Sequence, residues 1–380
     1  MGPLQVAIVA PSLDILGGQA VQADRLIRLW GDDADVRAWL VPHNPVPPRP
    51  LRPATKIKYL RTVVTEGTYL PLLVRELARA DIVHIFSASF FSFLLAPLPA
   101  AIIARLLGKP IVLNYRSGEA PVHLKQSAIA RTALRRVDRV VVPSQFLVDV
   151  MREFDIPATI VPNVVDLEAF RFRERDPLRP RLLSTRNFES LYNVACTLRA
   201  FRIVQDRWPD AELVLVGSGS EDESLRALAG ELQLKHVTFA GRIQQSDIPR
   251  FYAASDIYLQ TPNIDNMPGS VLEAFAAGLP AVSTAVGGVP VILRDGQHGL
   301  LAPVNDHEAV AARVLEFLDR PDYARQLARA GHATCRSYVW PEIRVQWLRL
   351  YRELLTEREP STLDRARPSL SKSSVDGSRS

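Results

Sequence analysis

The chain has 380 residues, 47% of them apolar and 23% charged, which is enough for about two domains with buried cores. This apolar content excludes a chain that is disordered throughout. The formal net charge is +5, and residues 1–170 contain 19 Lys and Arg against 15 Asp and Glu, so four of the excess positive charges lie in the first half.

A basic segment runs from Arg49 to Arg79. It contains seven Lys and Arg residues but only two acidic ones, Glu66 and Glu76. Such an excess suits a phosphate, an acidic glycan or an anionic membrane surface, and it is equally typical of a solvated basic face. Peripheral membrane contact through this half is therefore one of two interpretations that stay open.

The two cysteines, Cys196 and Cys335, are too few for a disulfide framework and lack the spacing of metal ligands. We therefore expect a reducing compartment and no metal site. The chain enters an apolar strand at once, without a basic leader, so we expect no secretory signal. Together these features predict a cytoplasmic protein, and a peripheral location at the inner face of a membrane is the second interpretation.

Apolar runs at residues 5–10, 81–86, 110–115 and 139–144 alternate with longer helical stretches in the first half. Continuous apolar strands separated by helices predict a parallel sheet that is covered on both faces. Six prolines within residues 41–53 predict an extended loop with polyproline character.

An apolar run at residues 82–107 approaches the length of a membrane span. His84, Pro97, Pro99 and Arg105 interrupt it. A buried strand followed by a helix explains this run better than a membrane-spanning helix. His84 is then expected to be a buried packing residue rather than a base.

A second series of apolar runs predicts a second parallel sheet, with strands at residues 181–185, 212–217, 237–241, 256–261 and 280–284. The charged, proline-bearing segment between the two series has the composition of a linker. We therefore predict two doubly wound α/β domains. Their boundaries are residues 1–170 and 178–337, followed by a last helix at 338–356 that packs back towards the first domain and a disordered tail at 357–380.

The stretch PNIDNMPGSVLEAFAAGLP, residues 262–280, places Asp265 eight positions before Glu273. A helix is predicted to begin near Gly269 and Ser270 and to end at Gly278. Amides at the start of a helix bind a diphosphate, and flanking carboxylates accept hydrogen bonds from sugar hydroxyls. Alternatively, Ser270 and Glu273 form a capping box.

This stretch resembles the retaining glycosyltransferases of family 4, which have the GT-B fold. The match is EAFAAGLP, preceded by Asp265 where the family has Glu. The resemblance implies two Rossmann-like domains facing a central cleft, with Asp265 contacting the donor sugar and Glu273 the ribose. It covers nearly the whole chain to about Leu355.

Other segments are similar to the family's remaining donor-site motifs. They include PSLDILGGQ with Gly17 and Gly18, LVLVGSGSE, VTFAGRI, and IVPNVVD, in which Asn163 and Asp166 are expected to hold the interdomain turn. The resemblance implies a donor site made of Gly17, Gly18, Arg186, Ser218, Gly219, Arg242, Ile243, Asp265, Asn266, Met267, Gly269, Ser270, Val271 and Glu273.

The chain departs from the family at two positions that bear charge. The family has an Arg followed five or six residues later by a Lys, which together neutralise the donor diphosphate; here Arg186 is followed by Leu191 or Tyr192. The family's sugar-binding His falls on Arg116, whose guanidinium would bind an acidic donor or acceptor, replace the lost lysine, or form a bracing ion pair with Glu119.

The resemblance implies metal-independent transfer of a sugar from a nucleotide-sugar to a hydroxyl group, in glycan, polysaccharide or glycolipid biosynthesis. Asp265, Arg116 and Arg186 would be its catalytic residues, the acceptor would be a glycan or a lipid-linked sugar, and no cofactor or nucleic acid is expected. Two alternatives remain. One is a nonhydrolysing nucleotide-sugar epimerase, and the other is a catalytically silent scaffold that binds a nucleotide-sugar, as the two departures suggest.

Overall fold

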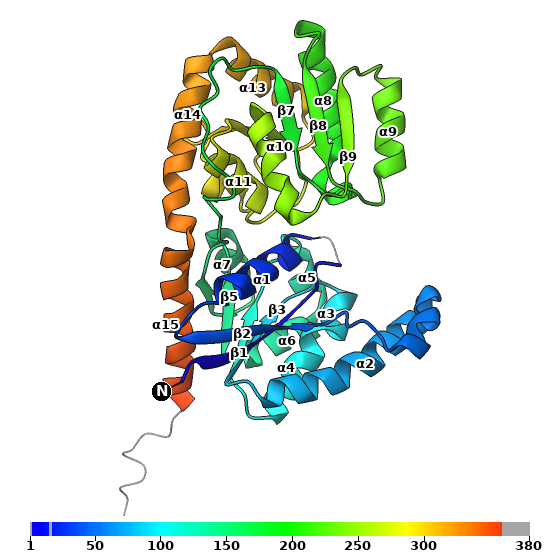
Figure 1. Cartoon of the computed structure of the whole chain (residues 1–380), viewed down its shortest axis with the longest axis vertical. Coiled ribbons are helices and arrows are strands. Elements are labelled where there is room, and N and C mark those ends of the chain that lie inside the picture. The colour runs from blue at the N-terminus through cyan, green and yellow to red at the C-terminus, as the bar shows by residue number, and fades with distance from the viewer. Residues whose placement is uncertain (1, 15–16, 359–380) are drawn as a thin grey trace, which may run out of the picture.

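The computed structural model describes residues 2–14 and 17–358, which form two α/β domains one above the other (Figure 1). The first domain contains a six-stranded parallel sheet with the strand order β2-β1-β3-β4-β5-β6. Its strands are β1 Leu4–Ala10, β2 Val36–Pro42, β3 Ile82–Phe86, β4 Ile111–Asn114, β5 Arg139–Val142 and β6 Ala158–Ile160. Its helices are α1 Gly18–Leu29, α2 Lys58–Ala78, α3 Phe91–Leu95, α4 Pro97–Leu106, α5 Ala120–Gln126, α6 Ala128–Arg136 and α7 Gln145–Arg152, with a 3-10 helix at Arg49–Lys56.

The second domain also contains a six-stranded parallel sheet, in the order β12-β11-β10-β7-β8-β9. Its strands are β7 Arg181–Ser184, β8 Glu212–Val216, β9 Val237–Gly241, β10 Ile257–Gln260, β11 Ala281–Thr284 and β12 Leu300–Ala302. Its helices are α8 Val194–Arg207, α9 Asp222–Glu231, α10 Ile248–Ala254, α11 Gly269–Ala277, α12 Val289–Ile292, α13 His307–Asp319 and α14 Pro321–Thr334, with 3-10 helices at Ser190–Tyr192, Gln245–Asp247 and Cys335–Tyr338.

Both sheets are covered on two faces, as their continuous apolar strands predict. In β1, Val6 and Ile8 pack into one core cluster with α1, whereas Ala7 and Val9 pack into another with α2 and α4. The second sheet lies between a cluster that includes α8 and α13 and one that includes α10 and α11. All nine strands predicted from the sequence are present, and the structure adds β2, β6 and β12.

The last helix, α15 (Trp340–Arg358), follows α14 along one side of both domains (Figure 1). Its buried face, which includes Ile343, Trp347 and Tyr351, packs into the core of the first domain. The chain therefore crosses between the domains twice, before β7 and again before α15. The predicted tail lies outside the described residues from 359 onward, and residues 357–358 end α15.

Of two predictions for the first domain, the one for the proline-rich loop holds only in part and the one for residues 82–107 is confirmed. The proline-rich loop is extended only up to residue 48, because Arg49–Lys56 forms a 3-10 helix, a conformation that the φ angle of proline permits. Residues 82–107 form β3, α3 and α4, as predicted for a buried strand followed by helix. In the part of the chain that the structure describes, no helix is long and apolar enough to cross a membrane.

Candidate functional site

A cleft of about 580 Å³ lies between the two domains. Its lining comes from the segments that follow β1, β3 and β4 in the first domain, and β7, β9 and β10 in the second. The carboxyl ends of both sheets therefore face the same space, which is where doubly wound α/β domains bind their ligands. Asp265, Glu273, Arg186 and Arg116 all line this cleft.

Asp265 and Arg186 form an ion pair in the cleft. Arg186 Nη2 lies 2.6 Å from Asp265 Oδ2, and both side chains are nearly buried. The strands β7 and β10 are neighbours, so the loops that follow them bring the two residues together. Burial lowers the pKa of Arg186, but the negative charge of Asp265, together with the nearby Tyr192, Tyr258 and Tyr252, gives a net upward shift. Asp265 thus holds the guanidinium charged beside the cleft.

Tyr192 occupies the region where the family's lysine is expected. Its ring centroid lies 4.0 Å from the Cζ atom of Arg186, which is a cation–π contact. Leu191 uses its backbone carbonyl to accept hydrogen bonds from the amides of Asn263 and Ile264. The missing cation is therefore replaced by an aromatic ring that fixes Arg186 rather than by a second charge.

Glu273 joins the two domains. Its Oε1 atom lies 3.1 Å from Arg25 Nη2 of α1, and its Oε2 accepts a hydrogen bond of 3.2 Å from the Tyr252 hydroxyl. Arg25 also donates to the carbonyl of Val164 at 2.5 Å. Burial raises the pKa of Glu273, and the charge of Arg25 opposes that shift. Because the carboxylate reaches Arg25 and Tyr252, the capping-box alternative is wrong, and α11 has no side-chain cap.

Replacing Arg25 with methionine should destabilise the protein more at pH 7 than at pH 4. Below pH 4.5, the ordinary pKa of Glu273, the carboxyl is protonated in both states. Above it the unfolded chain loses the proton first, and stability falls by about 1.4 kcal/mol per pH unit until the folded pKa is passed. Losing Arg25 raises that folded pKa and widens the window.

Urea unfolding of both proteins between pH 4 and pH 8 would measure this difference. The matched control is Arg28→Met, an arginine on the same helix whose side chain is 62% exposed. If Arg25→Met lowers the free energy of unfolding by the same amount at every pH, Arg25 acts through packing and not through the charge of Glu273.

Two helix starts open onto the cleft. Gly17 precedes α1 and Gly18 begins it, while Gly269 and Ser270 begin α11. Neither helix has a side-chain cap. A Cβ atom on Gly17 or Gly18 would meet no atom within 4 Å. The first amides of a helix have no partner within it and bind anions. The geometry therefore leaves room for a diphosphate beside these backbone donors.

Arg116 lies in the loop after β4. Its Nη1 donates to Asn114 Oδ1 at 3.1 Å, and its Nη2 is buried without a hydrogen-bond partner among the described residues. The predicted bracing pair with Glu119 is not formed. His84 is fully buried and hydrogen-bonds through Nδ1 to the Tyr351 hydroxyl at 2.7 Å, so it is a packing residue, as expected.

Three predicted donor-site residues lie elsewhere. Ser218 and Gly219 do not line the cleft; the Ser218 carbonyl accepts from the Phe188 amide, and a Cβ on Gly219 would lie 2.3 Å from the Phe188 carbonyl. This turn packs against the backbone of the β7 loop, since a Cβ on Gly217 would lie 2.1 Å from the Arg186 carbonyl. Val271 is a core residue of α11, because the helical period turns it away from the cleft that Ser270 and Glu273 line.

The other predicted residues lie at the cleft. Arg242 and Ile243 line it, and Arg242 Nη2 donates to the Leu13 carbonyl of the first domain at 3.0 Å. Asn266 accepts a hydrogen bond from the Ser144 hydroxyl, again across the domains. Met267 accepts through its carbonyl from Asn163 Nδ2 at 2.7 Å, which fits the expected role of Asn163 at the interdomain turn.

The sequence did not indicate the residues that reach Glu273 and Gly269 from elsewhere in the chain. Arg25 and Gln22 project from α1, and Tyr252 from α10; Gln22 Nε2 lies 3.5 Å from where a Cβ on Gly269 would stand. The helical spacing of Gln22 and Arg25 places both on one face. The structure shows that this polar face is buried, and burial of this kind is not read from the sequence.

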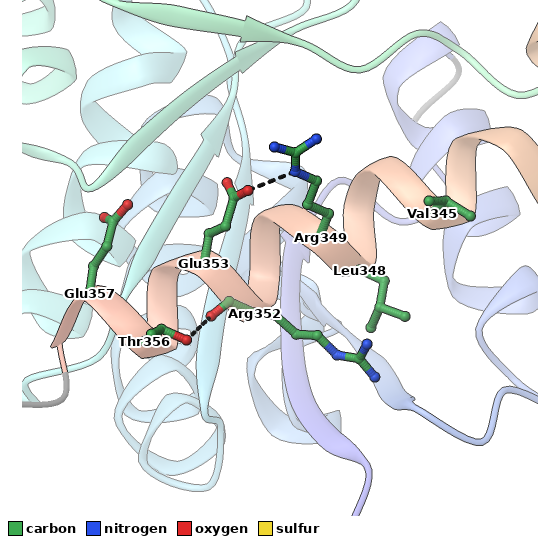
Figure 2. Close-up of a pocket in the computed structure, with 7 residues that line it drawn as sticks. All are labelled: Val345, Leu348, Arg349, Arg352, Glu353, Thr356 and Glu357. Carbon is green, nitrogen blue, oxygen red and sulfur yellow. Dashed lines mark hydrogen bonds and ion pairs between the residues drawn. The ribbon is translucent and has the colours of Figure 1, made fainter.

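A second hollow, of about 490 Å³, follows α15 on the outside of the protein (Figure 2). All its lining residues belong to this one helix, and Arg349 Nε pairs with Glu353 Oε1 at 2.7 Å. It is a surface depression beside exposed charges and contributes nothing to the cleft. No group of three or more His, Cys, Asp or Glu residues placed to hold a metal ion is found within the described ranges.

Two protein-family models match the chain. The model for glycosyl transferases group 1 matches residues 167–334, and the model for Glycosyltransferase Family 4 matches residues 16–169. The matched ranges correspond to the two domains and meet where the chain first crosses between them.

Curated relatives include two named glycosyltransferases. The sulfoquinovosyl transferase of Arabidopsis thaliana is 26% identical over 309 residues, covering 74% of this chain and 59% of that protein. The phosphatidyl-myo-inositol mannosyltransferase of Mycobacterium leprae is 31% identical over 206 residues, covering 52% of this chain and 54% of that protein. The chain thus spans between half and three fifths of these relatives.

Two solved structures share the architecture. Sucrose-phosphate synthase from Thermosynechococcus elongatus has a TM-score of 0.72 at 20% identity, and HepE from Anabaena, solved with UDP-glucose, has 0.72 at 15% identity. Each likeness covers 93% of this chain and 100% of the other. These likenesses confirm the predicted fold, which is GT-B.

Proposed function

Since the chain belongs to the glycosyltransferases of family 4, we propose that it moves a sugar from a nucleotide-sugar donor to a hydroxyl group of an acceptor, with retention of the anomeric configuration. The observation that carries this proposal is the placing of Asp265, Arg186 and Glu273 around the start of α11, in a cleft large enough for a small ligand. The structure of HepE with UDP-glucose supports a nucleotide-sugar as the donor.

In this proposal the diphosphate lies against the amides that begin α1 and α11, with Arg186 beside it. Asp265 holds the sugar and Glu273 accepts from the ribose hydroxyls. Negative charge develops on the leaving diphosphate, and preorganised donors and Arg186 stabilise it. The diphosphate takes the proton of the acceptor hydroxyl on the same face, and we expect no metal ion to be needed.

A thermal-shift screen of nucleotide-sugars, followed by transfer assays with the donors that stabilise the protein, tests this function. A ligand at 100 times its dissociation constant stabilises a folded protein by about 2.7 kcal/mol. The anomeric configuration of the product, measured by NMR, tests retention. Incubation with donor alone tests the epimerase alternative, which predicts an epimer without any acceptor.

The silent-scaffold alternative is favoured by one observation, the cation–π contact of Tyr192 where the family has lysine. If the site is active as it stands, Tyr192→Lys should lower turnover, because it removes the ring that fixes Arg186 and adds a second buried cation. Donor turnover in both proteins is the measurement. Binding without turnover in the natural sequence, and turnover created by the lysine, would favour the scaffold instead.

We further propose that the acceptor is a glycan or a lipid-linked sugar, since one curated relative is named as a phosphatidyl-myo-inositol mannosyltransferase. Helix α2 projects from the first domain (Figure 1) and exposes Leu60, Val63, Leu70 and Val74 at helical spacing, next to the basic residues of residues 49–79. Such a face suits an anionic membrane surface.

Flotation with liposomes checks this membrane contact. We expect binding to vesicles that contain anionic lipid, weak binding to neutral vesicles, and loss of binding at high salt. Replacing Val63 and Val74 with serine should reduce flotation several-fold. Equal recovery with neutral and anionic vesicles, or none with either, would contradict a membrane role for α2.

A further inference from the structure

Arg116 is a partly buried cation in the cleft whose charge no carboxylate among the described residues balances. It has no ion-pair partner among the residues that the structure describes, and its Nη2 atom is buried without an acceptor. Burial alone lowers the pKa of Arg116 to about 9. An arginine left in this state costs free energy unless a ligand supplies the missing negative group.

A chain of buried hydrogen bonds holds this guanidinium in place. Because Arg116 only donates, the Asn114 atom that faces it is the oxygen, so the Asn114 amide donates to His84 Nε2 at 3.0 Å. His84 then carries its proton on Nδ1, which donates to the Tyr351 hydroxyl of α15. Burial, and then the charge of Arg116, lower the pKa of His84 to about 3, so it stays neutral.

These hydrogen bonds fix Nη1 of Arg116 and leave Nη2 without a partner among the described residues. The Phe86 ring covers the guanidinium, with its centroid 5.6 Å from Cζ. His84 and Asn114 come from the neighbouring strands β3 and β4, Arg116 follows in the loop after β4, and Tyr351 comes from the last helix. Such support for one unpaired donor at the cleft is typical of a preorganised binding group rather than of a surface charge.

Arg116 lies near the part of the cleft where the proposed donor would place its sugar. Two residues further on, a Cβ atom on Gly118 would lie 3.0 Å from Ile264 Cγ2 and 3.3 Å from Asp265 Cα. The loop of Arg116 is therefore packed directly on the loop of Asp265. The amides proposed for the diphosphate belong instead to α1 and α11, and Gly269 is packed near Gln22 of α1.

We infer that Arg116 is a specificity-determining residue that binds an acidic group, a carboxylate or a comparable anion, on the transferred sugar. This inference rests on the proposed function. A carboxylate would accept a charge-assisted hydrogen bond from Nη2 and supply the counter-charge that the protein lacks. The donor would then be a nucleotide-linked sugar acid, and a neutral sugar would leave Nη2 unpaired. The other source of negative charge in the same ligand is the diphosphate.

Isothermal titration with three matched ligands separates these sources. The probes are UDP, UDP-glucose and UDP-glucuronate, of which the last two differ only at the sixth carbon. We expect UDP-glucuronate to bind about tenfold or more tighter than UDP-glucose. In Arg116→Gln that preference should vanish while the affinity for UDP changes by less than about twofold. Arg116→Lys, which keeps the charge without the fork, should keep part of the preference.

Arg136→Gln removes the same charge from an exposed site on α6 and controls for long-range electrostatics. Thermal unfolding of each variant shows whether it is folded. An equal loss of affinity for all three ligands in Arg116→Gln would place the diphosphate on Arg116 and overturn the inference. Tight binding of UDP-glucose without preference for the acid would also overturn it, while leaving the proposed function intact. If neither these ligands nor the matched GDP-sugars bind, the inference falls together with the proposed function.

Discussion

Replacing Asp265 with asparagine should lower transfer activity by about 100-fold or more, while the affinity for the free nucleotide diphosphate changes little. In the proposed function the carboxylate holds the sugar, and its 2.6 Å ion pair orients Arg186. A neutral amide does both less well, and small errors in position at a reacting centre cost about 100-fold in rate. Initial rates and a UDP titration on the same preparation measure the two effects separately.

The matched variant is Asp265→Glu, which restores the residue that the family has at this position. It keeps the charge and should keep part of the activity, with an altered choice of sugar, because the longer side chain reaches a different hydroxyl. An asparagine variant with full turnover would remove Asp265 from the site. Loss of UDP binding in parallel with turnover would mean that Asp265 acts only through Arg186 and the diphosphate.

Replacing Glu273 with glutamine should weaken donor binding by roughly 1–3 kcal/mol, which is about 5- to 150-fold, because an amide accepts ribose hydroxyls less strongly than a carboxylate. The structure adds a second effect. Arg25 loses its charge partner, so the free energy of unfolding should fall, although removing a buried carboxylate with a raised pKa recovers part of that loss.

A double-mutant cycle with Arg25→Met separates binding from stability. The effects of Glu273→Gln and Arg25→Met on stability should be strongly non-additive, since the two residues share one ion pair. Only Glu273→Gln should weaken the binding of the nucleoside diphosphate relative to that of inorganic pyrophosphate. Unchanged donor affinity in the glutamine variant would argue that Glu273 is a purely structural link between the domains.

The fold was largely predictable because its interior strands are continuous apolar runs. The three strands that were missed are β2, β6 and β12, and all three lie at a sheet edge. An edge strand has only one neighbour and is partly exposed, so its sequence alternates or is interrupted by polar residues. In β2, VRAWLVP, only Val36 and Val41 are buried. Such a strand is not distinguished from a loop by its sequence alone.

The candidate site was predictable only where it lies within one segment. The spacing of Asp265 and Glu273 around a helix start is a local feature, and both line the cleft. The Arg25–Glu273 pair joins residues 248 positions apart, and no local pattern indicates it. The same limit explains Arg116, where the sequence suggested a neighbour, Glu119, and the structure provides instead a hydrogen-bonded chain that ends on α15.

The central claim is that the cleft between the domains binds a nucleotide-sugar by its diphosphate at the start of α11. A crystal structure determined with a nucleoside diphosphate chosen by the thermal-shift screen tests it most directly. We predict the diphosphate against the amides of Gly269 and Ser270, opposite Gly17 and Gly18, with the ribose hydroxyls on Glu273. A nucleotide bound outside the cleft, or a cleft that stays empty at saturating ligand while the domains keep the same contacts, would contradict the claim.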